Sequence, residues 1–152
     1  MILALMFLLH FVADFILQSR EMGKKKSVEF RWLLTHLEIQ TIVFVIGLSY
    51  PLGIMLACKV AVCNSLIHGL IDWNIWKLYK LSAWRRIQNK LEVEAMHMDE
   101  AGSAMTFEIK QQREKEEIAT WQYWEDHLFY TIIGFDQLLH GLTLIFLAKS
   151  FL

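Results

Sequence analysis

The chain has 152 residues, enough for one domain, and 55% of them are hydrophobic, a high share for a water-soluble protein of this size. The formal net charge of −1 leaves no strongly basic surface, so the composition argues against a nucleic-acid partner. The two cysteines lie five residues apart in one apolar block, and they make neither a disulfide framework nor a CxxC zinc motif.

The apolar residues are gathered into four blocks, and a charged stretch separates the third block from the fourth. Crossing a bilayer takes about 20 apolar residues, which is close to the length of each block. We therefore predict an all-α integral membrane four-helix bundle with helices at about 1–18, 32–49, 52–76 and 128–151. The whole chain, 1–152, forms one membrane domain in this interpretation. A water-soluble four-helix bundle with an unusually apolar core is the alternative.

The first block is predicted as a permanent membrane helix rather than a signal peptide. It has no positively charged start, and no small-residue cleavage site follows it. Its segment "LLHFVADFILQ" carries His10, Asp14 and Gln18 at a spacing of four residues. Residues four apart stack on one face of a helix, so these three side chains form a polar stripe.

The following loop and the second block carry two further signals. The loop 19–31 contains the run Lys24, Lys25 and Lys26, which we interpret as a contact with anionic lipid at the cytoplasmic face. A plain topology anchor is the alternative for this run. In the second block, His36 and Gln40 repeat the spacing of four residues.

The third block repeats the stripe with Asn64, His68 and Asp72. After it, residues 82–127 form a charged segment that we predict to be a cytoplasmic insert, partly helical and able to bind a protein partner. Within the insert, "FEIKQQREKEEIATWQYW" is predicted as a mostly solvated helix.

The fourth block completes the pattern with Asp136 and His140, beside Gln137. With a helical rise of 1.5 Å per residue, the ionisable groups of all four helices fall in one layer, roughly 6–12 Å from the cytoplasmic end. His140 lies one turn deeper. The four segments run in alternating directions, so polar residues placed at random would lie at different depths. Their common depth therefore indicates a shared layer.

Ionisable groups within a membrane usually face the interior of a helical bundle, where they serve a functional site. Imidazole and carboxylate are the usual ligands of Zn²⁺, and they also suit Mn²⁺ or Fe²⁺. We predict a divalent-metal site, with zinc as the expected ion, held by His10, Asp14, His68, Asp72, Asp136 and His140.

Further roles are assigned around these ligands. Catalytic roles fall to Asp14, His36 and Asp72, with His36 as a ligand or a proton carrier. Groups expected to hydrogen-bond the ligands are Gln18, Gln40, Asn64 and Gln137.

Two alternatives remain open for this layer. Its groups would suffice for a two-metal centre, or for one metal together with acid–base groups. Any single His–Asp pair is also explained as a hydrogen bond that joins two helices without a metal.

The loops predict an orientation. The segments 19–31 and 77–90 each carry five basic residues, whereas 49–53 carries none. Basic residues collect on the cytoplasmic side of membrane proteins. We therefore predict a multi-pass protein of the bacterial inner membrane with both termini outside.

The motifs resemble one family of membrane proteins. That family begins with His-x-x-x-Asp-Phe-x-x-Gln, matched by "HFVADFILQ", and continues with a lysine loop and an early histidine, matched by "GKKKS" and "THLEIQ". Its later motifs are matched by "NSLIHGLIDWNIWK" and "FDQLLHGL". The chain thus resembles the small bacterial and phage proteins grouped as domain of unknown function 3307, a likeness that leaves out 82–127. It implies an integral membrane protein and supplies no activity.

We therefore expect a membrane-embedded, metal-dependent hydrolase whose metal activates water. A more distant likeness to membrane metal-dependent hydrolases with paired His and Asp agrees with this. A site near headgroup depth suggests a lipid or lipid-linked phosphoester as substrate.

One alternative function is a cation or proton transporter, or a channel subunit. Another is a non-enzymatic membrane protein that recruits a partner through 82–127. Membrane lipids are the expected surroundings, and a homo-oligomer would help to close the cavity.

Overall fold

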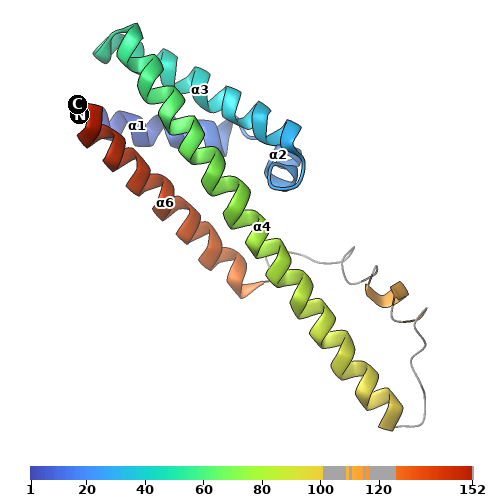
Figure 1. Ribbon diagram of the computed structural model, residues 1–152. Helices are drawn as coiled ribbons and strands as arrows, with labels where there is room; N and C mark the ends of the chain where they lie inside the picture. Colours follow the sequence, from blue (N-terminus) through green and yellow to red (C-terminus); the bar gives the residue numbers. More distant parts are fainter. Residues whose placement is uncertain (101–108, 110, 115, 117–125, 152) are drawn as a thin grey trace. The chain divides into compact units, whose positions relative to one another are not determined.

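A computed structural model describes residues 1–100, 109, 111–114, 116 and 126–151 of the chain. The all-α prediction is confirmed, because these residues contain helices and no strand. The chain divides into two compact units, which are treated separately below (Figure 1). The first unit comprises Met1–Lys77 and Ile132–Leu152, and the second comprises Leu78–Thr131.

The helices follow one another with short connections. In chain order they are α1 (Ile2–Phe11), the π-helical turn η1 (Val12–Ile16), α2 (Arg20–Lys25), α3 (Phe30–Leu52), α4 (Ile54–Glu100) and α6 (His127–Phe151). The short helix α2, in the loop 19–31, was not predicted. Its start is set by Ser19, whose Oγ accepts a hydrogen bond from the backbone N–H of Met22 at 3.2 Å.

A single residue, Gly53, joins α3 to α4. Its φ of 76° lies in the region that glycine alone adopts without strain. Pro51 stands two residues earlier, within the last turn of α3. The connection between the second and third predicted helices therefore needs only one residue outside the helices.

Among the described residues, three helices are long and apolar enough to cross a membrane: α3, the part of α4 from Ile54 to Val93, and α6. The first apolar segment is shorter, with 10 residues in α1 and 5 in η1. At 1.5 Å per residue it extends roughly 22 Å, less than the roughly 30 Å of a bilayer core. Four full-length spans were predicted, and the structure shows three.

Helix α4 does not end near residue 76 but continues to Glu100. The reason lies in a second stripe at a spacing of four residues, formed by Tyr79, Ala83, Ile87 and Leu91, all of which are buried. An amphipathic stripe of this kind, uninterrupted by glycine or proline, continues a helix. The predicted helix at 107–124 falls mostly outside the described residues.

The first unit is closed by an apolar cluster to which all its long helices contribute. Its members are Met6 of α1, Phe44 and Leu48 of α3, Ala57, Val60 and Ala61 of α4, and Leu144 and Leu147 of α6. Ile2 and Phe151 also pack against this cluster, so the two termini lie at the same end of the unit (Figure 1).

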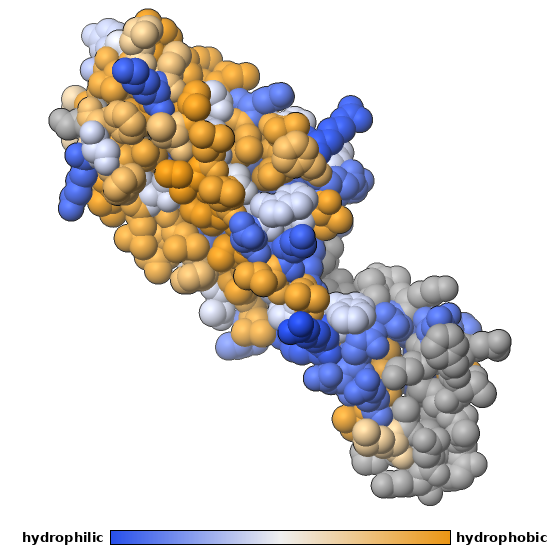
Figure 2. All heavy atoms as spheres, viewed as in Figure 1, coloured by the Kyte–Doolittle hydropathy of each residue, from blue (hydrophilic) through white to orange (hydrophobic). Residues whose placement is uncertain are grey.

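The first unit has polar residues inside and large apolar residues outside. Exposed side chains include Phe11 on α1, Ile46 on α3 and Leu66 on α4. Figure 2 shows the visible surface of this part of the chain as mainly apolar. A surface of this kind is matched to lipid, whereas water-soluble proteins rarely expose such large apolar areas.

The second unit has an ion pair at the start of α6. Asp126 accepts hydrogen bonds from Arg86 at 2.6 and 3.0 Å and from the Tyr79 hydroxyl at 2.9 Å. It also caps α6 by accepting from the Leu128 N–H at 3.0 Å. Burial alone would raise the pKa of the Asp126 carboxyl, but the bonds from Arg86, Tyr79 and Leu128 hold that pKa below its usual value.

Candidate metal centre

The predicted ionisable groups of all four apolar blocks meet inside the first unit. None exposes more than 6% of its surface. The seven residues, which we call the His/Asp cluster, are His10, Asp14, His36, His68, Asp72, Asp136 and His140. A group of ionisable side chains therefore lies inside the first unit.

The first helical segment contributes His10 and Asp14. His10 lies in the last turn of α1, and Asp14 lies in η1, where the helix widens to a π-helical turn. Turns of this kind occur frequently at functional sites. The widened turn still leaves the two side chains together, with His10 Nε2 3.5 Å from Asp14 Oδ2.

Two histidines stand at the middle of the cluster. The Nε2 atoms of His36 on α3 and His68 on α4 are 2.9 Å apart. Asp14 Oδ1 lies 3.5 Å from each of these nitrogens. Asp72 Oδ2 lies 3.3 Å from His36 Nε2 and 3.1 Å from His68 Nε2. The two Nε2 atoms therefore each face two carboxylates.

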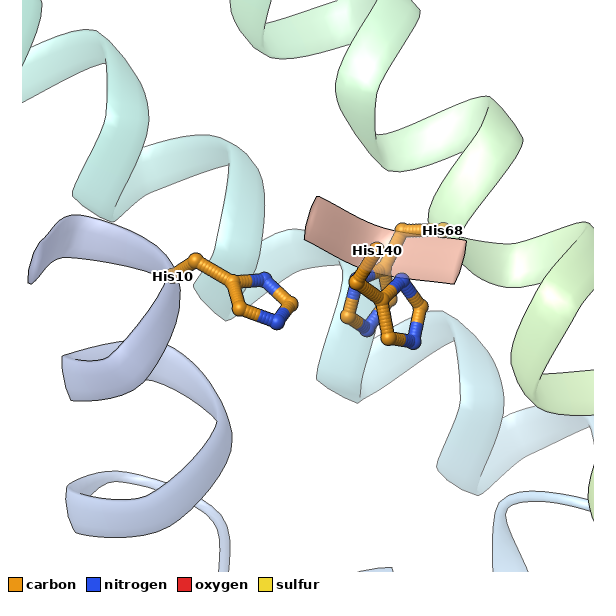
Figure 3. Close-up of side chains that lie close together, drawn as sticks. All are labelled: His10, His68 and His140. Carbon is orange, nitrogen blue, oxygen red and sulfur yellow. The ribbon is translucent and has the colours of Figure 1, made fainter. Parts of the chain in front are cut away.

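Helix α6 completes the cluster with Asp136 and His140. His140 Nε2 lies 3.6 Å from Asp136 Oδ1 and 3.7 Å from Asp72 Oδ1. The rings of His68 and His140 are stacked with centroids 4.0 Å apart, and the His10 ring approaches His140 to 4.9 Å (Figure 3). Three helices thus bring their imidazoles to one place.

The cluster contains three overlapping sets of side chains that are close enough to hold a metal ion. In each set the possible ligand atoms lie within 4.8 Å of one another. The sets are His10–His68–His140, Asp14–His36–His68 and Asp72–Asp136–His140. Because His68 and His140 each belong to two sets, the seven residues form one continuous site.

Two of the four predicted supporting residues contact the cluster. The Gln40 amide nitrogen lies 3.1 Å from His10 Nδ1 and 3.4 Å from His68 Nδ1. Gln137 donates a hydrogen bond to Asp136 Oδ2 at 3.3 Å. No hydrogen bond within the described part of the chain joins Gln18 or Asn64 to the cluster, although Asn64 is buried nearby on α4.

The lysine run divides in a way that the sequence did not predict. Lys24 is exposed, and Lys25 is half-buried with its Nζ 3.4 Å from Glu21. Lys26, by contrast, is only 4% exposed, and its Nζ lies 2.7 Å from Asp72 Oδ2. The interpretation of all three as surface lipid contacts therefore does not suit Lys26, which belongs to the site.

The sequence contains a pattern consistent with the burial of Lys26, but this pattern has meaning only if α2 is known to be a helix. Met22 and Lys26 are four residues apart and are both buried, and α2 packs against α3. Without knowledge of that helix, three consecutive lysines are equivalent, and nothing in the local pattern singles out one of them.

The fold and the cluster together define a class: an all-helical protein with membrane-length helices and an internal His/Asp centre able to hold a metal ion. The chain belongs to the family described as Protein of unknown function (DUF3307), whose family model matches residues 2–152. The predicted resemblance is thus confirmed, and the match also includes 82–127. Comparisons with curated proteins and with solved structures give no match.

Proposed function

We propose that this protein is a membrane-embedded hydrolase that uses a divalent metal ion in its His/Asp cluster. The observation that carries the proposal is a set of buried nitrogen and oxygen atoms that face one another without hydrogen-bond partners. They are His10 Nε2, His140 Nε2, Asp14 Oδ1, Asp72 Oδ1 and Asp136 Oδ1. Buried polar atoms are nearly always satisfied, and leaving one unpaired costs about 1–3 kcal/mol.

The spacing of the ligand atoms argues against hydrogen bonds alone. Most nitrogen–oxygen distances across the cluster are 3.5–3.7 Å, longer than ordinary hydrogen bonds of about 2.7–3.2 Å. Two ligand atoms bound about 2.1 Å from one ion at tetrahedral or octahedral angles lie roughly 3.0–3.4 Å apart, so a small inward movement would place these atoms around a cation. A cation among them would give each unpaired atom a partner.

Gln40 supports the same assignment. A metal ligand must present a lone pair, so His10 and His68 would need their protons on Nδ1 and free Nε2 atoms. A half-turn of the Gln40 amide brings its oxygen to the two Nδ1 atoms, where it accepts both N–H bonds. The amide oxygen has no hydrogen-bond partner in its present orientation. Outer-sphere hydrogen bonds of this kind orient metal-binding imidazoles.

The surroundings of the cluster favour hydrolysis over transport. One helical turn beyond His10, Gln40, Asn64 and His140, on the same faces, stand four apolar residues. They are Met6, Phe44, Val60 and Leu144, all buried in the apolar cluster. This layer would block an ion path through the bundle, whereas a dead-end site suits a reaction at one membrane face.

The proposed chemistry assigns a role to each part of the cluster. The metal would polarise water and lower its pKa. His10, His68, Asp72, Asp136 and His140 would hold the metal, and Asp14 with His36 would accept the proton. We propose a lipid or lipid-linked phosphoester as substrate, reached from the cytoplasmic side of a bacterial inner membrane. That orientation follows from the basic residues of the loop 19–31.

The experiment is a metal analysis joined to an activity assay. Protein purified in detergent without chelators should contain a divalent ion and should release phosphate from phosphatidate in mixed micelles. Chelation should abolish the activity, and Zn²⁺ or Mn²⁺ should restore it. His68→Ala should lower metal affinity by more than about a hundredfold. His127→Ala is the matched control, because His127 is an exposed histidine at the start of α6.

Each arm has a result that would contradict the proposal. A folded wild-type chain that takes up no divalent ion would reject the metal centre. Bound metal without phosphate release would reject the phosphoester substrate and leave the centre in place. Equal losses in the His68 and His127 variants would show that the effect does not come from the cluster.

A further inference from the structure

Lys26 is a buried cation within the candidate metal centre. It directly follows α2, and its Nζ lies 2.7 Å from Asp72 Oδ2 and 3.5 Å from His36 Nε2. A lysine is almost never fully buried unless it is paired. Here the pairing is with a carboxylate that also faces three histidines, so the ammonium is part of the cluster's charge balance.

The charges of the site can be summed from its buried residues. Apart from histidines, the charged residues that are buried in the described part of the chain are Asp14, Lys26, Asp72 and Asp136. Histidines that bind metal are neutral. Three carboxylates and one ammonium leave a net charge of −2, which one divalent cation neutralises.

We infer that Lys26 limits the cluster to one divalent cation per chain. This inference rests on the proposed function and decides between the one-metal and two-metal forms of the site. Two divalent ions would leave a buried net charge of +2, and an uncompensated charge in a low-dielectric interior is strongly unfavourable. One ion with Lys26 leaves the site neutral.

The contacts of Asp72 show which of its oxygens Lys26 leaves available to the ion. Its Nζ contacts Asp72 Oδ2, the oxygen that faces His36 and His68, while Asp72 Oδ1 faces His140 at 3.7 Å. Neither Asp72 oxygen accepts a hydrogen bond from the described residues, and only Oδ2 is paired with the Lys26 ammonium. Lys26 thus holds one oxygen of the carboxylate and leaves the other for the ion.

The test is the metal stoichiometry and affinity of four chains, measured with Mn²⁺ and Zn²⁺ by calorimetry and elemental analysis. The wild type should bind one ion. Lys26→Met removes the charge, keeps much of the side-chain volume and leaves a net charge of −3. It should therefore bind the first ion at least about tenfold more tightly or accept a second ion. Lys26→Arg keeps the charge and should bind one ion.

The control is Lys24→Met, which makes the same change at an exposed lysine two residues away. It should bind one ion with wild-type affinity. If Lys26→Met does not fold, judged by circular dichroism, the stoichiometries of the wild type and of Lys26→Arg decide. One ion in both supports the inference, and two ions in either overturns it.

The remaining outcomes separate the inference from the proposed function. Two ions in the wild type, or a folded Lys26→Met chain with unchanged or weaker binding of one ion, would overturn the role of Lys26 and leave the metal centre standing. A wild-type chain that binds no ion would overturn the metal centre and, with it, the inference.

Discussion

Helix α4 buries two stripes of opposite chemistry. In the first unit the buried stripe is polar and consists of Asn64, His68 and Asp72. In the second unit it is apolar and consists of Tyr79, Ala83, Ile87 and Leu91. Both stripes have the same spacing of four residues, so periodicity alone identifies the buried face without revealing what is buried there.

The exposed faces of α4 also differ, but less completely. The first unit exposes Leu66 and Leu70, whereas the second exposes Arg85 and Glu92 together with apolar side chains such as Leu81. An apolar exterior is matched to lipid, and charged side chains are matched to water. The comparison teaches that one continuous helix has an apolar exterior beside the His/Asp cluster and a mixed, partly charged exterior beyond it.

The largest change in the free energy of unfolding is expected when a side chain of the apolar stripe in the second unit is truncated. Leu91 is fully buried, so Leu91→Ala should lower the free energy of unfolding by about 2–5 kcal/mol. The matched control is Leu66→Ala on the exposed, lipid-matched face of the same helix, with an expected change of less than about 0.5 kcal/mol. Chemical denaturation in detergent micelles measures both. Equal losses at the two positions would contradict the comparison.

The polar cluster should respond differently, through metal binding rather than folding. Asp136→Asn keeps the shape of the side chain and removes its charge without unpairing Lys26, which contacts Asp72, so metal affinity should fall by about a hundredfold or more. The free energy of unfolding of the metal-free protein should change much less. Titration with Zn²⁺ measures the affinity, and Asp126→Asn in the second unit should leave it unchanged. A variant that loses stability but, where it is folded, binds Zn²⁺ as tightly as the wild type would favour a structural role for Asp136.

The smallest effect is expected at the ion pair of the second unit. The pKa of Asp126 is lowered in the folded chain, so the charged carboxylate stabilises the fold above its unfolded pKa of about 3.9. This contribution is lost as the pH falls through the lower, folded pKa. Because Arg86 is partly exposed, we expect it to be only about 0.5–1 kcal/mol. Asp126→Asn should therefore be less stable than wild type at pH 7, with a difference that shrinks in acid. A difference that is constant with pH would exclude the carboxylate charge as its cause.

Much of the site could be predicted because it is encoded locally. His10 with Asp14, His68 with Asp72, and Asp136 with His140 are each four residues apart, and the helical period places both members of a pair on one face. The cost of ionisable groups in lipid then directs these faces inward. The five motif segments also identified the family. Composition and periodicity were therefore sufficient for an all-helical chain with an internal His/Asp layer.

Other features depended on contacts between distant segments. The end of the third predicted helix was placed near residue 76 because the apolar block stops there, yet α4 continues on a different stripe. Likewise, the first apolar segment ends in a π-helical turn at Ile16, which no propensity indicates. Helix ends are set by packing and capping as much as by composition, so local patterns locate them poorly.

By itself, the sequence determined which residues share a face and that those faces carry metal-binding chemistry, because the helical repeat acts over four residues. Only the tertiary structure decided that Lys26, and not Lys24 or Lys25, joins the cluster. Three adjacent lysines have the same local propensities and charge. They differ only in what lies opposite them once α2 packs against α3, and the carboxylate of Asp72, 46 positions further along the chain, stands opposite just one of them.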